Sequence, residues 1–282
     1  MHDPNAPPAP SPPPAPERTQ RFRRLHEAGC FVIPNPWDVG SARLLAGMGF
    51  AALATTSSGL AWSLGRRDNH VTLEECLAHL RAVCGSVPVP VNADFEGGFA
   101  VEPQAVAANV ALAVTTGIAG LSVEDSTGDR SQPLFPFPLA VERIVAARRA
   151  IDASGTGVVL TARCEDFLVG RADLTATLQR LTAYAEAGAD CLYAPGLRSL
   201  SDITAVVQAV APKPVNVLVS HDFTTVATLA AAGVRRISVG SGLARAAWTG
   251  FLRAAREIAD HGRFTGLAEI VPFAELEKMF GD

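Results

Sequence analysis

Acidic side chains follow three short apolar segments of the sequence, at the points where those segments end. Asp94 ends the segment VPVNAD and Glu96 stands two residues later, Glu124 follows GLSV, and Asp68 lies in a long loop after FAALAT. Carboxylates that converge in a cleft repel one another unless a cation neutralises them. Oxygen ligands without a His or Cys companion favour a hard ion. If these segment ends are neighbours in space, the four acids predict a Mg²⁺ site, with Mn²⁺ as the next choice.

Groups that bind anions occur at two further segment ends. Arg163 follows GVVLTA, and a guanidinium can hold a carboxylate or phosphonate with two parallel hydrogen bonds. The turn of Ser57, Ser58, Gly59 and Leu60 offers backbone N–H donors, and its glycine permits close approach. Together these residues predict a site for a small anionic substrate.

Candidates for proton transfer and polar contact complete the set. Glu165 stands two residues after Arg163, and Asn216 and His221 lie on or just after a later apolar segment. Arg163 could also serve only as an ion-pair partner of Glu165 or Glu124. We treat Arg163, Glu165 and His221 as candidate catalytic residues and Asn216 as a substrate contact, with a water on the metal as a further acid–base candidate.

The elements that must position these residues alternate regularly. Short, continuously apolar segments favour strands that are buried on both faces of a parallel sheet. Eight of them occur, at residues 31–34, 50–55, 89–94, 119–125, 157–163, 190–194, 214–219 and 235–240. Helical patterns separate them, at 39–48, 73–83, 103–115, 139–151, 174–187, 202–210 and 224–232. Several of these helices end at a glycine, as a left-handed C-terminal cap requires.

This count predicts a (β/α)₈ TIM-type barrel, because an open doubly wound sheet usually has fewer strands. Barrel enzymes place their sites where the strands end, so the acids and Arg163 should meet at one face. We expect residues 1–17, which are rich in Pro and Ala, to be a disordered leader, and residues 18–282 to form a single domain. Helices at 243–259 and 273–280 exceed what the barrel requires, and we expect the terminal one to pack on another subunit.

Composition excludes several classes of function. The net charge of −4 argues against a protein that coats nucleic acid or an anionic membrane. Hydrophobic residues make up 48% of the chain, yet no uncharged apolar run is long enough to span a membrane. The five Cys are odd in number and show no CxxC spacing, which favours reduced thiols and a cytoplasmic location.

The ordered set of motifs resembles the isocitrate lyase/phosphoenolpyruvate mutase superfamily over about residues 19–258. The motifs that carry this resemblance are FVIPNPWDVGSARLL, TTSSGL, GRRD, NADFEGG, GLSVEDST and TARCEDF. The resemblance implies a Mg²⁺ site of Asp68, Asp94, Glu96 and Glu124, in which Asp94 binds the ion directly and the others act largely through water. It also implies that the Ser58–Leu60 turn receives the carboxylate of a pyruvate- or glyoxylate-like group.

The same resemblance implies that Arg163 contacts the acidic group of the substrate. It further implies that neighbouring subunits exchange helices near the C-terminus, in a homo-oligomer such as a dimer or tetramer.

The sequence departs from both characterised branches of the superfamily. The lyase branch has a KKCGH loop after the third strand, whereas here NADFEGGFAVEP contains no Cys. The mutase branch has a Lys- and Asn-bearing gating loop, where Arg130 and Gln132 stand instead.

A Mg²⁺, a carboxylate cradle and one arginine suit an enolate derived from a 2-oxo acid. We therefore expect a Mg²⁺-dependent lyase or decarboxylase of a small 2-oxo or 2-hydroxy mono- or dicarboxylate. One alternative is P–C bond chemistry, either hydrolysis of phosphonopyruvate or phosphonomutase activity. A second is a barrel that binds a phosphate ligand at the glycine turn of RRISVGSGLAR.

Overall fold

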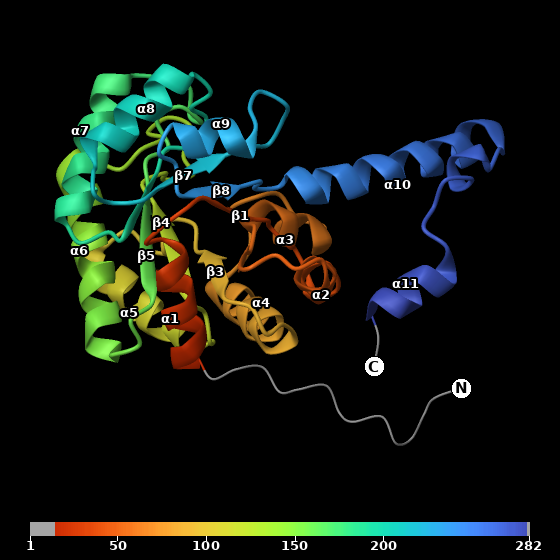
Figure 1. Cartoon of the computed structure of the whole chain (residues 1–282), viewed down its shortest axis with the longest axis horizontal. Coiled ribbons are helices and arrows are strands. Elements are labelled where there is room, and N and C mark those ends of the chain that lie inside the picture. Colours follow the sequence, from red (N-terminus) through yellow and green to blue (C-terminus); the bar gives the residue numbers. More distant parts are fainter. Residues whose placement is uncertain (1–14, 281–282) are drawn as a thin grey trace.

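Eight parallel strands form one closed sheet in the computed structural model, which describes residues 15–280 (Figure 1). The strands are β1 (Phe31–Ile33), β2 (Leu53–Ala54), β3 (Val91–Asp94), β4 (Gly120–Glu124), β5 (Val159–Arg163), β6 (Cys191–Tyr193), β7 (Val215–Leu218) and β8 (Arg236–Ser238). Each strand pairs with the next along the chain from β2 to β8, and β8 pairs with β1. A hydrogen bond from the backbone N–H of Ala54 to the carbonyl of Pro34, 3.0 Å long, joins β2 to the end of β1. The predicted barrel is confirmed.

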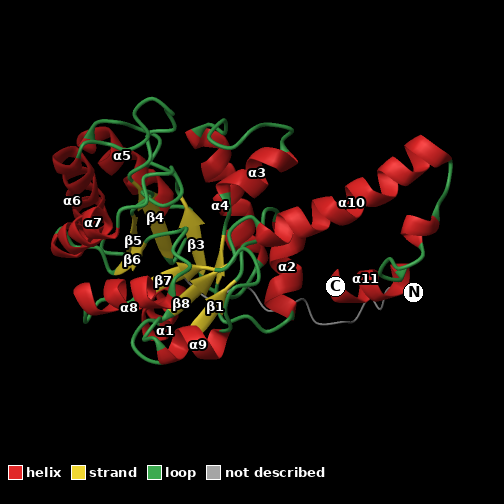
Figure 2. Ribbon diagram, turned by 90° about the horizontal axis from the view of Figure 1, so that it is seen from above, coloured by secondary structure: helices red, strands yellow, loops and turns green. Residues whose placement is uncertain are grey.

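Helices cover the outside of the sheet (Figure 2). The helices of the described residues are α1 (Ala15–Leu25), α2 (Val39–Gly47), α3 (Ser57–Ser63), α4 (Leu73–Ser86), α5 (Pro103–Val114), α6 (Phe137–Ser154), α7 (Leu174–Glu186), α8 (Leu200–Ala209), α9 (Val226–Ala231), α10 (Gly242–His261) and α11 (Phe273–Phe280), of which α2 and α4 to α9 form this outer layer. A short 3₁₀ helix, Thr265–Leu267, lies between α10 and α11.

Side-chain caps fix where several of the helices begin. Asp38 and Ser41 form a reciprocal capping box at α2, and Thr72 and Glu75 form another at α4.

Two helices were not expected from the sequence. Helix α1 begins at Ala15, so residues 15–17 of the expected leader are helical, whereas residues 1–14 lie outside the described part of the chain. Helix α3 replaces the expected turn at residues 57–60, because the Thr56 side chain caps it by accepting a hydrogen bond from the N–H of Gly59. Both helices bear on the site, since α1 closes one end of the barrel and α3 lies at the other.

The inside of the barrel changes from apolar to polar along its axis. At the end where the strands begin, Phe22 of α1 packs against Ala52, Ala119 and Val159, and all four side chains are buried. Further along the strands the inward-facing residues become polar. These residues are Asn92, Ser122, Thr161, Asn216, Arg236 and Ser238, all of them buried. Barrel interiors are usually filled by branched apolar side chains. The polar layer of this barrel is therefore unusual, and it suggests a role in binding a polar ligand.

The C-terminal helices extend away from the barrel. Helix α10 projects outward as a long arm, and α11 returns toward α2 (Figures 1 and 2). There the ring of Phe280 lies against Gly40, and Arg43 donates a hydrogen bond to the carbonyl of Phe280. Large apolar side chains remain exposed on α10, among them Trp248 and Phe251. None of the helices in the described residues has the length and apolar character needed to cross a membrane.

Candidate active site

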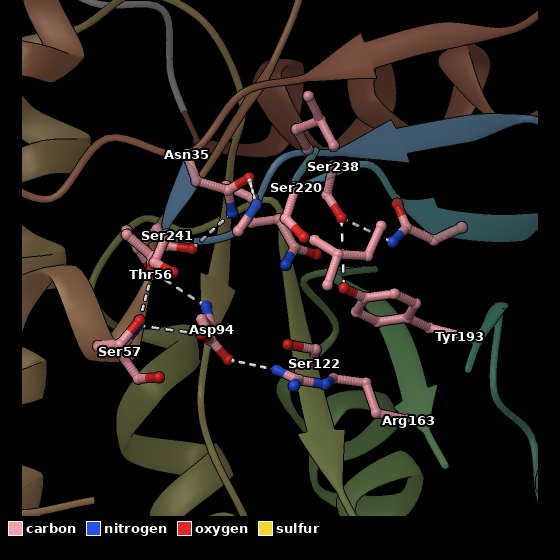
Figure 3. A pocket seen from close by; sticks show the side chains of 18 of the residues that line it. Asn35, Thr56, Ser57, Asp94, Ser122, Arg163, Tyr193, Ser220, Ser238 and Ser241 are labelled. Atoms are coloured by element: carbon pink, nitrogen blue, oxygen red, sulfur yellow. Dashed lines mark hydrogen bonds and ion pairs between the residues drawn. The ribbon is translucent and has the colours of Figure 1, made fainter. Parts of the chain in front are cut away.

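A cavity of about 290 Å³ opens at the ends of the strands, where the sequence places its charged residues (Figure 3). It runs from the strand ends down into the polar layer of the barrel. Among its lining residues are Asn35, Ser57, Ser58, Asp68, Asn92, Asp94, Ser122, Arg163, Tyr193, Asn216, Arg236, Ser238 and Arg245. Of the four predicted metal residues, Asp68 and Asp94 line the cavity, whereas Glu96 and Glu124 do not. Four of the predicted substrate residues line it, together with two arginines, Arg236 and Arg245, that sequence analysis did not single out.

Arg163 is surrounded by carboxylates. Its Nη1 atom lies 2.8 Å from Oδ1 of Asp94, and its Nη2 atom lies 3.1 Å from Oε2 of Glu124. Nη2 and Nε each lie 2.9 Å from Oε1 of Glu165. The guanidinium also lies over the ring of Tyr193, 5.2 Å from the ring centroid. Because these acids outnumber the cation, they raise the pKa of Arg163 well above its usual value despite its burial.

Asp94 links this arginine to helix α3. Its Oδ2 atom accepts a hydrogen bond of 3.0 Å from the backbone N–H of Ser57, while its own N–H donates to the hydroxyl of Thr55 (2.9 Å). The first residue of α3 is thereby tied to the end of β3. Ser57 and Ser58 line the cavity, whereas Gly59 and Leu60 are buried in α3 and do not. The predicted substrate turn is thus the first turn of a helix, and only its first half faces the cavity.

The pKa values of the remaining acids are raised, although Arg163 lowers each of them in part. Burial and the charge of Asp94 raise the pKa of Asp68. Burial, followed by the charges of Asp94 and Asp68, raises the pKa of Glu96 to about 8. Burial raises the pKa of Glu124 well above its usual value, although Arg163 opposes this effect. Each shift means that added negative charge is unfavourable here, which is the electrostatic condition that favours a bound cation.

The carboxylate oxygens of the site suit a hard divalent ion, but they are not arranged as a direct cluster of three ligands. Within residues 15–280 no three His, Cys, Asp or Glu side chains are close enough to form a direct metal cluster. The oxygens of Asp94 face the cavity, and Asp68 and Glu96 are near enough to shift pKa values together with it. The set therefore suits an ion held by Asp94, with the other acids acting through water. The full ligand assignment stays a prediction.

Glu165, His221 and Asn216, the candidates for proton transfer and polar contact, differ in burial and in position relative to the cavity. Glu165 is buried beneath Arg163, and burial raises the pKa of its carboxyl. His221 is exposed, contacts the hydroxyl of Ser220 and lines a separate surface depression. Asn216 lines the cavity, but its amide is engaged on both sides, by Ser238 and by Arg236. The structure brings neither Glu165 nor His221 to the cavity wall, so their catalytic roles stay predictions.

Comparison with known proteins agrees with this geometry. The model of the phosphoenolpyruvate phosphomutase family matches residues 22–259. The chain belongs to the phosphoenolpyruvate mutase/isocitrate lyase superfamily. Members of this superfamily are lyases, hydrolases and decarboxylases that act on small acids, and they generally use Mg²⁺.

Several relatives are similar over nearly their whole length. A solved structure from Burkholderia cenocepacia J2315, named only as a candidate lyase/mutase, is 45% identical with a TM-score of 0.92, over 95% of this chain and 98% of that one. An uncharacterised protein of Mycobacterium tuberculosis is 34% identical over 93% of this chain and 96% of its own. The structure of 2,3-dimethylmalate lyase is 26% identical with a TM-score of 0.83, over 94% of this chain and 95% of that one.

Arg143 anchors the loop that follows β3. Arg143 of α6 is buried and donates hydrogen bonds to the carbonyls of Gly97, Ala100 and Val101, the last at 2.6 Å. Its guanidinium also lies 3.9 Å from the ring centroid of Phe135. These contacts fix the short loop to α6, and this loop, NADFEGGFAVEP, contains no Cys.

A second buried network lies behind the site and was missed by sequence reasoning. The carboxylate of Asp125 accepts hydrogen bonds from the hydroxyl of Tyr184 (2.6 Å), from Arg180 (3.1 Å) and from the backbone N–H of Glu165 (2.9 Å). Asp125 follows Glu124 directly, so the network fixes the ends of β4 and β5 together. The adjacent Glu-Asp pair was the available signal, but nothing in the spacing indicated that α7 would supply the partners.

Proposed function

We propose that this superfamily member is a Mg²⁺-dependent lyase or decarboxylase of a small 2-oxo or 2-hydroxy mono- or dicarboxylate, acting through an enolate. The observation that supports this proposal most is the cavity that holds Asp94, Arg163 and the first residues of α3 at one end of the barrel. That set can hold a hard cation and an anionic substrate side by side. Relatives with such activities include a Pseudomonas aeruginosa oxaloacetate decarboxylase, 29% identical over 66% of each chain.

In the decarboxylation of oxaloacetate, the C3–C4 bond breaks and its electron pair passes to C3 and the C2 oxygen. Carbon dioxide leaves, and a proton then adds to C3 to give pyruvate. Bound Mg²⁺ would supply positive charge opposite the developing enolate oxygen. The chain's own residues would bind and orient the substrate: Ser57 and Ser58 line the cavity and would receive its carboxylate, and Arg163 lines the same cavity.

Tyr193 is our candidate for the proton donor. It lines the cavity, and burial raises the pKa of its hydroxyl to about 12, so the group stays protonated at neutral pH. Arg163 lies over its ring, and the hydroxyl of Ser238 is 3.4 Å from the hydroxyl of Tyr193. Tyr193→Phe should therefore lower the rate of pyruvate formation while leaving the affinity for oxalate nearly unchanged.

The decisive test is a substrate panel measured with Mg²⁺ and with a chelator. We expect pyruvate or glyoxylate release from oxaloacetate or from a 2-hydroxy diacid, lost with the chelator and restored by Mg²⁺. The match to the phosphomutase family model favours P–C bond chemistry as the second candidate. Release of phosphate from phosphonopyruvate, without carbon–carbon cleavage of any diacid, would favour that candidate instead.

We also propose that the chain forms homo-oligomers through α10 and α11. Helix α10 leaves its own barrel with Phe251 59% exposed, and Phe273 of α11 is 79% exposed. Burying such side chains against a second copy is favourable. Light scattering on size-exclusion fractions should give a dimer or tetramer, and a stable monomer would contradict this proposal. The cytoplasmic location expected from the free thiols stays a prediction.

A further inference from the structure

Arg236 occupies an unusual position for a charged residue. It lies on β8 in the polar layer of the barrel, is 3% exposed, and lines the floor of the cavity that holds the candidate active site. A buried charge is costly unless it is paired. Yet Arg236 forms no ion pair with an acidic side chain anywhere in residues 15–280. The floor of the cavity therefore carries an uncompensated positive charge.

The partners of Arg236 are neutral. Its Nε donates to Oδ1 of Asn216 (2.9 Å), and its Nη2 donates to the hydroxyl of Thr161 (3.0 Å). Its Nη1 lies 3.3 Å from Nε2 of His26. The Nδ1 atom of His26 is 2.8 Å from the carbonyl of Phe22, which can only accept, so Nδ1 carries the proton and Nε2 accepts from the arginine. A neutral imidazole holds the guanidinium in place without neutralising it.

The guanidinium keeps free donors for a ligand. It has five N–H groups, and three of them are used in these bonds, so two remain. The cavity also contains an unsatisfied acceptor, since Oδ1 of buried Asn92 has no hydrogen-bond partner in the described residues. Buried polar groups without partners are costly. The free N–H groups of Arg236 favour an anionic group, whereas Oδ1 of Asn92 favours a donor such as a water or a substrate hydroxyl.

The floor lies within reach of the proposed reaction centre. Thr161, which contacts Arg236, is two residues before Arg163 on β5, a rise of about 6.6 Å along the strand. An extended C4 diacid is long enough for its two carboxylates to lie at different heights along the strand. Arg163 itself is engaged by Asp94, Glu124 and Glu165, so it has little capacity left for a second anionic group.

We propose that Arg236 forms a second anion subsite, at the floor of the barrel, which receives the distal carboxylate of a dicarboxylate substrate. The inference rests on the proposed function for its first subsite, where the 2-oxo or 2-hydroxy acid end is held near Asp94. It adds a substrate class, because a monocarboxylate would leave the charge of Arg236 unpaired. Asn216 and His26 are positioning residues for the guanidinium.

A pair of matched ligands tests this subsite on the wild-type protein. (S)-Malate and its 4-amide share the 2-hydroxy acid end and differ in the charge of the distal group. Calorimetry with Mg²⁺ present should show malate binding about tenfold or more tighter than the amide, as expected for a charge-assisted hydrogen bond. Equal affinities for the two ligands would overturn the proposal without any variant having to fold.

Variants then assign the preference to a residue. Arg236→Gln should bring the two affinities to within about twofold while leaving the affinity for oxalate, which lacks a distal group, unchanged. Arg236→Lys should keep part of the preference for malate. Arg245→Gln is the matched control, because Arg245 lines the same cavity but is exposed at its mouth. If Arg245→Gln loses the preference for malate over its amide and Arg236→Gln keeps it, then Arg245 binds the distal carboxylate at the mouth of the cavity. That result would overturn the proposal.

The test of the Arg236 subsite can fail independently of the test of the lyase activity. A protein that prefers malate through Arg236 but releases no product from any diacid keeps the subsite and loses the lyase assignment. A protein that cleaves a diacid yet binds malate and its amide equally keeps the reaction and loses the subsite. Far-ultraviolet circular dichroism of each variant checks that the barrel remains folded.

Discussion

The Asp94 carboxylate is shared between two sides of the site, because Oδ1 lies 2.8 Å from Nη1 of Arg163 and Oδ2 accepts a hydrogen bond from the N–H of Ser57. One side chain thus connects β3, β5 and α3. Its position explains why it raises the pKa of both Asp68 and Glu96. A cation bound at Asp94 would relieve the repulsion of all three acids at once.

Asp94→Ala should therefore abolish the stabilisation of the protein by Mg²⁺ and its activity. Without metal, the variant should lose little stability, because removing one of several repelling carboxylates offsets the lost ion pair with Arg163. Thermal unfolding across a Mg²⁺ titration measures both effects. Glu74→Ala, an exposed acid in the first turn of α4, is the control and should respond to Mg²⁺ like the wild type. Unchanged Mg²⁺ affinity in Asp94→Ala would refute the assignment.

Oxalate should bind only when Mg²⁺ is present, because it mimics the enolate of pyruvate and can chelate the ion through two oxygens. Arg163→Lys should weaken oxalate by about 1–3 kcal/mol, since a point charge replaces a planar fork. The fork here also holds Asp94, Glu124 and Glu165 in place, which an ammonium cannot do. Calorimetry with and without metal provides the measurement, and binding of oxalate to the metal-free protein would contradict this prediction.

The Asp125 network predicts a stability effect at a distance from the cavity. Tyr184→Phe removes a hydrogen bond of 2.6 Å to a buried carboxylate and should cost about 1.5–3 kcal/mol. Arg180→Met should cost more, about 3–5 kcal/mol, because it leaves Asp125 without its cation. Urea unfolding measures both. Thr175→Val, which removes an exposed hydroxyl on α7, the helix of Arg180 and Tyr184, should stay within about 0.5 kcal/mol of the wild type.

The sequence predicts the barrel well because each strand lies within its expected apolar segment and glycines follow many of the helices. It also places Asp94, Glu124 and Arg163 together, since the ends of parallel strands meet at one face. These inferences depend only on local pattern and on one topological rule.

Other features depend on contacts between distant elements, which no local pattern encodes. Arg236 reads as the start of an ordinary strand, and only closure of the barrel shows that it faces His26 of α1, 210 residues away in sequence. His221 follows a strand end, as a site residue should, yet its ring lies beside Phe223 (5.5 Å between centroids) and outside the cavity. The direction of a side chain in a loop is set by packing and not by its distance from a strand.

The loop after β4 gives a prediction about motion. Residues 126–134 form a small hairpin in which Ser126 pairs with Leu134 and the N–H of Thr127 donates to the carbonyl of Pro133. Its tip at Gly128–Arg130 is exposed. If the hairpin is a lid that closes on substrate, tryptic cleavage after Arg130 should slow when Mg²⁺ and oxalate are both present, but not with either alone.

The double variant Arg130→Ala/Gln132→Ala should then lower turnover more than ligand affinity, because the contacts of these side chains form only in the closed state. Equal cleavage rates under all conditions, together with wild-type turnover of the double variant, would show that the hairpin is a simple connection.

His26 predicts how stability depends on pH. Burial, followed by the charge of Arg236, lowers its pKa from 6.5 to about 3, so the folded protein keeps the imidazole neutral while the unfolded chain protonates it below pH 6.5. Its contribution is therefore fully present above pH 6.5 and is lost as the pH falls from 6.5 toward 3. Buried carboxyls with raised pKa values, such as Glu96, act in the opposite direction, so the measurement must separate the effect of His26 from theirs.

The variant His26→Gln keeps an acceptor for Arg236 but cannot titrate. Between pH 7.5 and 5.0 the wild type should lose up to about 2 kcal/mol more unfolding free energy than this variant, measured by urea denaturation. Parallel pH profiles would show that His26 is already charged beside Arg236, and the neutral partner assigned to the buried guanidinium would then be wrong.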